Sequence, residues 1–241
     1  MEQSESGASV FRQAERNREF ELALGDSQNI ECITDHIEKH IGPIESVFHE
    51  LVSDAVHIDV HVIAPSNNRP FYTLVTSGMS DRPMNAPAGR EDFRYSELMI
   101  CLPANWPMSQ EDWQIHDNYW PVHLLKFMAR FPHQQDTWYW SQHTVPNGDP
   151  PAPYADNTGM CCAMLAPPLT APEEFRKLTV NRNKTIHFQA IVPLLLDEMD
   201  LKLKKGAEAL MEGFQRNRVS ELLRPRRSSV IQNKRWWHIG G

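Results

Sequence analysis

Residues 56–84, VHIDVHVIAPSNNRPFYTLVTSGMSDRPM, decide the fold of this chain. In the first half of this stretch, valine or isoleucine at every second position alternates with His57, Asp59 and His61. A period of two places alternate side chains on opposite faces of a β-strand. Residues 71–76 are rich in β-branched and aromatic side chains, and the PSNN before them has the composition of a turn. The pattern predicts a β-hairpin near the centre of a mixed domain, with His57, Asp59 and His61 displayed on one face.

The composition is that of an ordinary globular protein. The chain has 241 residues, 41% of them hydrophobic and 23% charged, which suits one large domain or two small ones. A formal net charge of -7 argues against nucleic acid as a partner, because phosphate binding needs a basic surface. The four cysteines form no CxxC pair, so we expect free thiols in a reducing compartment. We also expect no membrane span and no signal peptide, and therefore a cytoplasmic protein.

Local patterns predict the other elements in chain order. They are a helix over 30–41, a strand over 44–51, a strand over 95–102, a helix with Asp117 as its N-cap that Pro132 closes, strands over 160–165, 177–180 and 185–192, and a long helix after Pro193 that bends at Gly206.

The chain shows no internal repeat and no linker within residues 30–215, which favours one domain over two. We expect a flexible N-terminal arm over residues 1–29, the domain itself over 30–217, and a mobile basic tail over 218–241. Arg224, Arg226 and Arg227, which precede two serines, suit either a basophilic kinase site or a solvated tail.

Six segments, in order, resemble the suppressor of fused family: HIEKHIGPIESVFHEL, VHIDVHVIAP, FYTLVTSGMSDRPM, SELMICLPANW, WPVHLLKFMARFP and IVPLLLDEMDLKLKKGAEALM. The resemblance covers roughly residues 30–215. It implies an α+β fold in which helices flank a central mixed β-sheet, as a single suppressor of fused-like domain closest to the stand-alone bacterial members. Eukaryotic relatives bind a transcription factor of the Hedgehog pathway, and bacterial relatives are regarded as immunity proteins of polymorphic toxin systems. The family carries no established catalytic residues over to this chain.

The histidine face of the hairpin has three interpretations. His57, Asp59 and His61 lie about 6.6–7 Å apart in turn along a strand, and they suit a polar partner-binding face. A pair of them could hold Zn²⁺, as His-x-His strands do, with Glu50 as a further ligand or general base. A polar outward face can also be purely structural. If this face binds a metal, the alternative function is that of a metal-dependent hydrolase.

The loop after the hairpin and an aromatic segment are the other candidate sites. In Ser77-Gly78-Met79-Ser80-Asp81, the glycine permits a positive φ and leaves backbone N–H groups for an anion or a peptide terminus. The loop is neither a nucleophile elbow nor a P-loop. It is either a structural turn or the rim of a binding cleft, where Ser77, Met79 and Asp81 would touch a partner.

Trp138, Trp140 and His143 lie in a segment, residues 137–153, that is too irregular for a regular element. Aromatic side chains in such a loop are enriched at interfaces, where they give a large contact area. They are equally what a loop needs to fix itself to a core. Both interpretations stay open.

The residues and the resemblance together favour a non-enzymatic protein-binding domain with no cofactor. Its partner would be a toxin or a regulatory protein, held by occlusion. An acidic inhibitor suits a basic target such as a nuclease toxin, because opposite fields raise the association rate. The alternatives are the metal-dependent hydrolase and a regulator or scaffold that sequesters a transcription factor.

Overall fold

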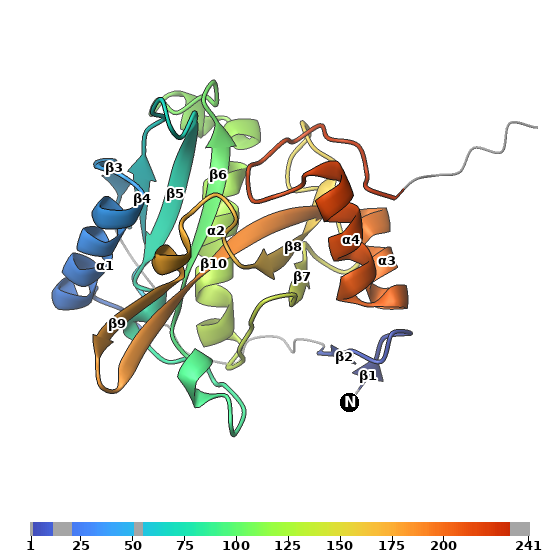
Figure 1. Ribbon diagram of the computed structural model, residues 1–241, viewed down its shortest axis with the longest axis horizontal. Helices are drawn as coiled ribbons and strands as arrows, with labels where there is room; N and C mark the ends of the chain where they lie inside the picture. Colours follow the sequence, from blue (N-terminus) through green and yellow to red (C-terminus); the bar gives the residue numbers. More distant parts are fainter. Residues whose placement is uncertain (1, 12–20, 51–54, 232–241) are drawn as a thin grey trace, which may run out of the picture.

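A mixed β-sheet forms the centre of the molecule (Figure 1). The computed structural model describes residues 2–11, 21–50 and 55–231. The strand order is β3-β4-β5-β6-β10-β8-β7, and β9 pairs with β10 off this path. The strands are β3 (Ile44–Phe48), β4 (Asp59–Ile63), β5 (Phe71–Ser77), β6 (Ser96–Pro103), β7 (Thr144–Pro146), β8 (Met160–Ala166), β9 (Lys177–Asn181) and β10 (Lys184–Leu195). A separate small hairpin consists of β1 (Glu2–Gln3) and β2 (Ser9–Val10).

The predicted central hairpin is confirmed. β4 and β5 pair antiparallel, with Asp59 opposite Ser77 and His61 opposite Val75. The pairing of β6 with β10 is parallel, and the other pairings of the large sheet are antiparallel. The sheet is therefore mixed, as expected for the α+β class.

Helices cover both faces of the sheet and one end of it (Figure 1). They are α1 (Ser27–His40), α2 (His116–Gln134), α3 (Leu196–Lys205) and α4 (Ala207–Asn217), with short 3-10 turns η1 (Met79–Asp81), η2 (Glu91–Phe93), η3 (Asp112–Gln114) and η4 (Glu173–Arg176). The valine and isoleucine face of β4 packs in one core with α2. The opposite face packs in a second core with α1. A third core joins α3 and α4 to β8 and the end of β10.

The start of α1 is fixed by a side chain. The Asp26 carboxylate accepts hydrogen bonds from the backbone N–H of Gln28 and Asn29, at 3.1 and 3.2 Å, as an N-cap does. The isoleucine spacing that predicts this helix is confirmed, because Ile33 and Ile37 are fully buried. The helix thus begins at Ser27, slightly earlier than residue 30.

Two prolines lie inside α2, and the prediction for both ends of this helix is wrong. The N-cap is Ile115 rather than Asp117, and the helix continues past Pro132 to Gln134. A proline leaves the carbonyl four residues earlier without its helical N–H donor. The hydroxyl of Tyr139 donates to the Met128 carbonyl, which Pro132 leaves free.

The proline at the other end of α2 has the same kind of compensation. Pro121 leaves the Asp117 carbonyl without a helical donor. The side-chain amide of Asn157 donates to this carbonyl at 2.7 Å. Helix α2 therefore tolerates both prolines because side chains from outside the helix replace the missing hydrogen bonds.

Pro193 does not end the last strand, which corrects a second prediction. β10 continues through Pro193 to Leu195, and Pro193 lies opposite Ala163 of β8. The pairing with β6 stops at Ala190 and Met99, so among the described residues no strand pairs with that edge of β10 at Pro193. A proline is tolerated where the ladder needs no N–H. The predicted break at Gly206 is confirmed, since α3 and α4 meet there at a φ of 85°.

The segment expected to be a mobile tail is instead packed over its described part, residues 218–231. The Cys101 N–H donates to the Glu221 carbonyl at 3.0 Å, and the Leu223 N–H donates to the Cys101 carbonyl at 2.8 Å. These bonds form a parallel bridge beside β6, beyond the end of its pairing with β10. The remainder of the expected tail, residues 232–241, lies outside the described residues.

The described parts of the N-terminal arm also contact the domain. The Ser6 N–H donates to the Leu203 carbonyl at 3.0 Å, and the Ala55 N–H donates to the Glu21 carbonyl at 3.0 Å. Within the described residues, no helix combines the length and the apolar character that crossing a bilayer requires.

Candidate functional site

The histidine face of β4 is buried rather than displayed, which corrects the expectation from the sequence. Asp59 and His61 are each 2% exposed. β4 is an inner strand between β3 and β5, and α1 packs over the sheet face that a period of two makes polar. His61 Nε2 lies 2.9 Å from Ser77 Oγ, and burial lowers the pKa of His61 to about 4. This imidazole is therefore neutral and internal.

The Asp59 carboxylate lies between two imidazoles. Its Oδ2 is 3.0 Å from His49 Nδ1 and its Oδ1 is 3.1 Å from His57 Nε2. The Glu50 N–H also donates to Asp59 Oδ1, at 3.3 Å. The carboxylate that could bind a metal or a partner thus has its contacts within the chain.

The hydrolase alternative gains no support from this geometry. The Glu50 carboxylate, the expected general base, forms an ion pair with Arg130 of α2. His61 bonds to Ser77 and not to the group around Asp59. Across residues 2–11, 21–50 and 55–231, no three His, Cys, Asp or Glu side chains are placed to hold a metal ion.

The SGMSD loop folds inward as a structural turn. Gly78 has a φ of 98°, and a Cβ at this position would lie 1.7 Å from the His57 carbonyl oxygen. Ser77 and Ser80 are fully buried, and Met79 is 1% exposed. Only glycine fits this turn, because both the positive φ and the close approach exclude a side chain.

The loop does donate hydrogen bonds to a carboxyl group, but that group belongs to this chain. Glu97 of β6 is fully buried, and its carboxylate accepts from the Ser80 N–H at 2.9 Å and from the Ser80 hydroxyl at 2.6 Å. The Thr76 hydroxyl donates to its other oxygen at 2.6 Å. Burial raises the pKa of Glu97 to about 7. We call Thr76, Ser80, Asp81, Asn29 and Glu97 the Glu97 network.

Asp81 connects this network to the start of α1. The Asn29 amide donates to the Ser80 hydroxyl at 3.0 Å and to Asp81 Oδ1 at 2.6 Å, and the Asp26 N–H donates to Asp81 Oδ2 at 3.0 Å. Burial raises the pKa of Asp81. These contacts place Ser77, Met79 and Asp81 within the structure of the domain. Of the two interpretations of the loop, the geometry supports the structural turn rather than the rim of a binding cleft.

The aromatic segment is fixed to the domain. Trp140 lies 4.5 Å from Phe93 and 5.0 Å from His187, measured between ring centroids. Trp138 meets the edge of His143 at 5.3 Å and packs against the core with α2. All three predicted residues are half-buried. The structure brings Trp138, Trp140 and His143 together and separates them from the buried histidine face.

A groove that none of the predicted partner-binding residues line opens beside the C-terminal segment. It has a volume of about 730 Å³. Its walls come from the turn after β6, the start of α2 and the segment after α4. The lining residues are Pro103, Asn105, Trp106, Pro107, Asn118, Asn157, Asn217, Val219, Arg224, Pro225, Arg226, Arg227, Ser228 and Ser229.

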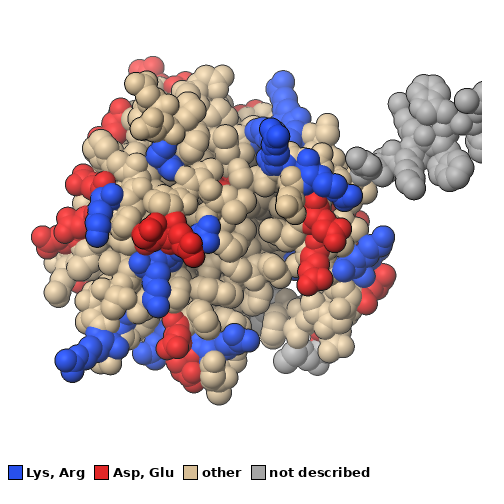
Figure 2. All heavy atoms as spheres, viewed as in Figure 1, with Lys and Arg blue, Asp and Glu red and all other residues tan. Residues whose placement is uncertain are grey.

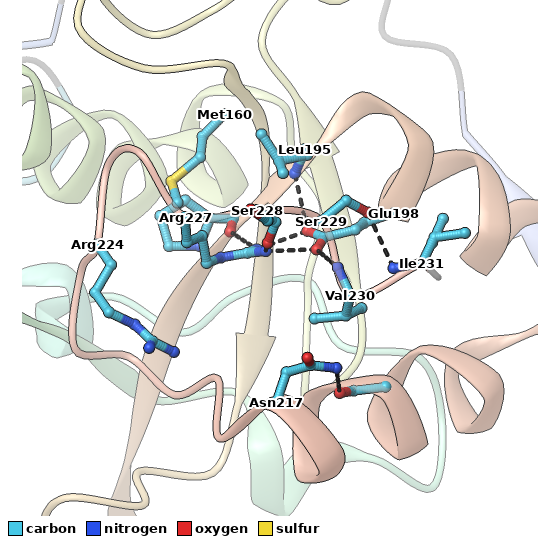
Figure 3. Close-up of polar contacts among 12 residues, drawn as sticks. Met160, Leu195, Glu198, Asn217, Arg224, Arg227, Ser228, Ser229, Val230 and Ile231 are labelled. Atoms are coloured by element: carbon cyan, nitrogen blue, oxygen red, sulfur yellow. Dashed lines mark hydrogen bonds and ion pairs between the residues drawn. The ribbon is translucent and has the colours of Figure 1, made fainter. Parts of the chain in front are cut away.

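Two buried carboxylates hold the C-terminal wall of the groove in place. Glu198, at the start of α3, accepts from Arg227 Nη1 at 2.5 Å and Nη2 at 2.6 Å, and from the Leu195 and Val230 N–H groups at 3.0 Å each (Figure 3). Glu221 accepts from the Thr170 N–H at 2.7 Å. The wall is therefore anchored to the domain, in contrast to the solvated tail expected from its arginines.

Sequence reasoning missed the groove because its parts are far apart in the chain. The arginine run was visible in the sequence. The apolar Val219, Leu223 and Val230 around it, which are all buried, are the signal that argues against a free tail.

These features define the class of the protein, an α+β domain with a central mixed sheet between helices, whose buried polar clusters are structural. The family model described as Suppressor of fused protein (SUFU) matches residues 54–228. The chain therefore belongs to the suppressor of fused family, and both the family resemblance and the expected fold class are confirmed.

Solved structures share the fold. A suppressor of fused homologue from Neisseria gonorrhoeae has a TM-score of 0.62 at 15% sequence identity, over 86% of this chain and 99% of that chain. A Sufu–Fu complex contains a chain with a TM-score of 0.59 at 15% identity, over 84% of this chain and 92% of that one. Drosophila Suppressor of Fused has a TM-score of 0.58 at 13% identity, and this chain covers 51% of it. No curated protein sequence matches significantly.

Proposed function

We propose that this chain is a non-enzymatic binding domain that holds another protein. The observation that carries the proposal is the groove of about 730 Å³, an open surface lined by both apolar and polar residues. The side chains considered for catalysis already contact other groups of the chain, because Asp59 contacts two histidines and Glu50 pairs with Arg130. A related chain occurs in a Sufu–Fu complex, which supports a protein as the partner.

Binding would block a surface of the partner and would need no chemical step. The C-terminal wall of the groove is held by the buried Glu198 and Glu221 carboxylates before any partner arrives. A preorganised surface loses little conformational entropy on binding, which leaves more of the contact energy for affinity. Tight occlusion by a small rigid domain is therefore physically reasonable.

The particular role we propose is neutralisation of a toxin by an immunity-type protein. The net charge of -7 would attract a basic target and raise the association rate. A regulatory partner is the second candidate, favoured by the Sufu–Fu complex among the related structures.

Reconstitution tests this function. The purified chain would be mixed with the protein encoded next to it, and the mass of the complex measured by size-exclusion chromatography with light scattering. We expect a stoichiometric complex in which the partner's activity is lost. A partner that is toxic when expressed alone and harmless in the complex supports the immunity role. Turnover of a substrate by the isolated chain, or no complex with neighbouring gene products, would contradict the proposal.

A further inference from the structure

We infer that the groove binds an acidic, extended segment of a partner protein. The inference rests on the proposed protein-binding function and specifies which part of a partner the groove selects. It rests on the chemistry of the lining residues, on the exposure and hydrogen-bond partners of each arginine, and on the apolar surface between the polar groups.

The groove is lined by hydrogen-bond donors and lacks carboxylates. Four asparagines, three arginines and two serines line it, and no lining residue that the structure describes is Asp or Glu, although the whole chain contains 31 of them. Three of the asparagine amides, those of Asn118, Asn157 and Asn217, already donate to backbone carbonyls within the chain. The donors left for a ligand therefore come mainly from the exposed guanidinium groups, and arginine only donates. The complementary ligand is rich in acceptors, which describes carboxylates together with the carbonyls of an extended peptide.

The arginines of the groove are not equivalent. Arg227 is neutralised by Glu198 and is buried, with a side chain 7% exposed. Arg224 is exposed and uses one N–H on the Arg218 carbonyl, at 3.0 Å. Arg226 is exposed, and its side chain has no partner in the described part of the chain. Arg224 and Arg226 therefore retain donors and charge for a ligand.

These arginines give an acidic protein a local basic surface. Figure 2 shows Lys and Arg side chains gathered at the upper right, over the region where the C-terminal segment lies in Figure 1. Charged groups at a binding surface determine which partner segments are accepted, because like charges repel. The rim of the groove should attract an acidic segment and repel a basic one.

The apolar part of the lining suits an extended chain. Trp106, Val219 and the prolines 103, 107 and 225 provide flat, rigid contact surface between the polar groups. The Trp106 indole N–H is already used on the Asn118 carbonyl at 3.0 Å, so the ring is fixed in place. A volume of about 730 Å³ accommodates a few residues of peptide and not a whole domain.

Labelled peptides test the inference directly. The probe is a fluorescein-labelled peptide in which glutamate alternates with proline around a central leucine. Two matched peptides carry lysine or phosphoserine in place of glutamate. Fluorescence anisotropy with the full chain should give saturable binding of the acidic peptide that weakens with added salt, because the rim arginines are solvent-exposed.

Charge reversal locates the site. The double variant Arg224→Glu/Arg226→Glu should weaken binding of the acidic peptide by at least about tenfold. The control Arg90→Glu/Arg182→Glu makes the same change in charge at two exposed positions outside the groove, and it should change the affinity by less than about twofold. Circular dichroism and thermal melting confirm that each variant is folded.

Three results would overturn the inference: equal binding of the lysine peptide, binding of the phosphoserine peptide alone, or equal loss of affinity in both double variants. The test is separable from the proposed function. If the groove variant forms the complex with a partner protein as tightly as the unaltered chain, the acidic-segment inference fails and the protein-binding function stands. If neither chain binds a partner, the proposed function fails, whatever the peptides show.

Discussion

Arg227 and Glu198 form a buried, two-pronged ion pair that joins the C-terminal segment to the start of α3 (Figure 3). Their side chains are 7% and 0% exposed. Two parallel N–H···O bonds between a guanidinium and a carboxylate are among the stronger side-chain contacts. The pair fixes the wall of the groove, so it is the natural first target for mutation.

Removing one partner of this pair should destabilise the domain. Glu198→Ala leaves the Arg227 charge without its carboxylate partner, although the guanidinium keeps the Pro193 carbonyl, and it leaves the Leu195 and Val230 N–H groups without their acceptor. Breaking a buried pair in this way costs about 3–5 kcal/mol of the free energy of unfolding. Urea denaturation followed by circular dichroism measures the loss. Asp197→Ala, at the exposed neighbouring position, is the control, and equal stability of the two variants would show that the pair is unimportant.

The Glu97 network predicts a pH-dependent difference between two variants. Burial raises the pKa of Glu97 to about 7 in the folded state, above the ordinary 4.5. Its contribution to stability is therefore fully present below pH 4.5 and is lost as the pH rises toward 7. Glu97→Gln lacks this loss, so the stability of the variant relative to the unaltered chain should increase by about 1.4 kcal/mol per pH unit across that range. Urea denaturation between these pH values measures the difference, and a pH-independent difference would contradict the assignment.

Buried histidines should make the fold sensitive to acid. Burial lowers the pKa of His61 and of His133 from 6.5 to about 4. A histidine held neutral contributes stability that is present above pH 6.5 and is lost as the pH falls toward 4. Each residue should account for a slope of about 1.4 kcal/mol per pH unit in this window. His133→Gln should remove the contribution of one histidine, about 1.4 kcal/mol per pH unit, from this slope. His116→Gln, at an exposed position, should leave the slope unchanged. Equal slopes for both variants would refute the prediction.

Gly78 should tolerate no side chain. Gly78→Ala combines a φ of 98° with a Cβ 1.7 Å from the His57 carbonyl oxygen, so the chain must shift or fail to fold. Gly89 is a matched control with a φ of 82° and nothing within 4 Å of its Cβ position. We expect Gly89→Ala to cost about 1 kcal/mol from backbone strain, and Gly78→Ala to cost more than about 3 kcal/mol or to be insoluble. Soluble yield and urea midpoints distinguish the two, and similar behaviour would contradict the close contact.

The hydroxyl of Tyr139 should stabilise α2 at its proline. Tyr139→Phe removes the donor to the Met128 carbonyl, which Pro132 leaves free. Leaving a buried carbonyl unpaired costs about 1–3 kcal/mol. Tyr119→Phe is the control, since that hydroxyl has no described hydrogen bond. Thermal unfolding of both variants provides the measurement, and an unchanged melting temperature for Tyr139→Phe would show that the bond contributes nothing.

Elements with a strong local period could be predicted from the sequence, and contacts between distant residues could not. The β4–β5 hairpin follows from alternation with a period of two, and α1 follows from isoleucines spaced three or four residues apart. The alternation in β4 separates two faces correctly, but it does not reveal that α1 covers the face with His61. Whether a polar face meets water depends on an element elsewhere in the chain.

The same limit explains the errors at Pro193 and in the C-terminal segment. Pro193 is tolerated in β10 because β6 has already stopped pairing there. Arg227 looks like part of a solvated run until Glu198, 29 residues earlier, is placed beside it. The groove shares this origin, since Trp106 and Arg226 are distant in the sequence and line the same groove only in the folded molecule.

The bridge between Cys101 and Leu222 has a consequence for synthesis of the protein. The middle of the sheet receives its last hydrogen bonds from residues made about half a chain later, so β6 cannot be completed until the ribosome has released that segment. During translation the nascent sheet carries an open edge, which is the state in which β-rich chains associate wrongly.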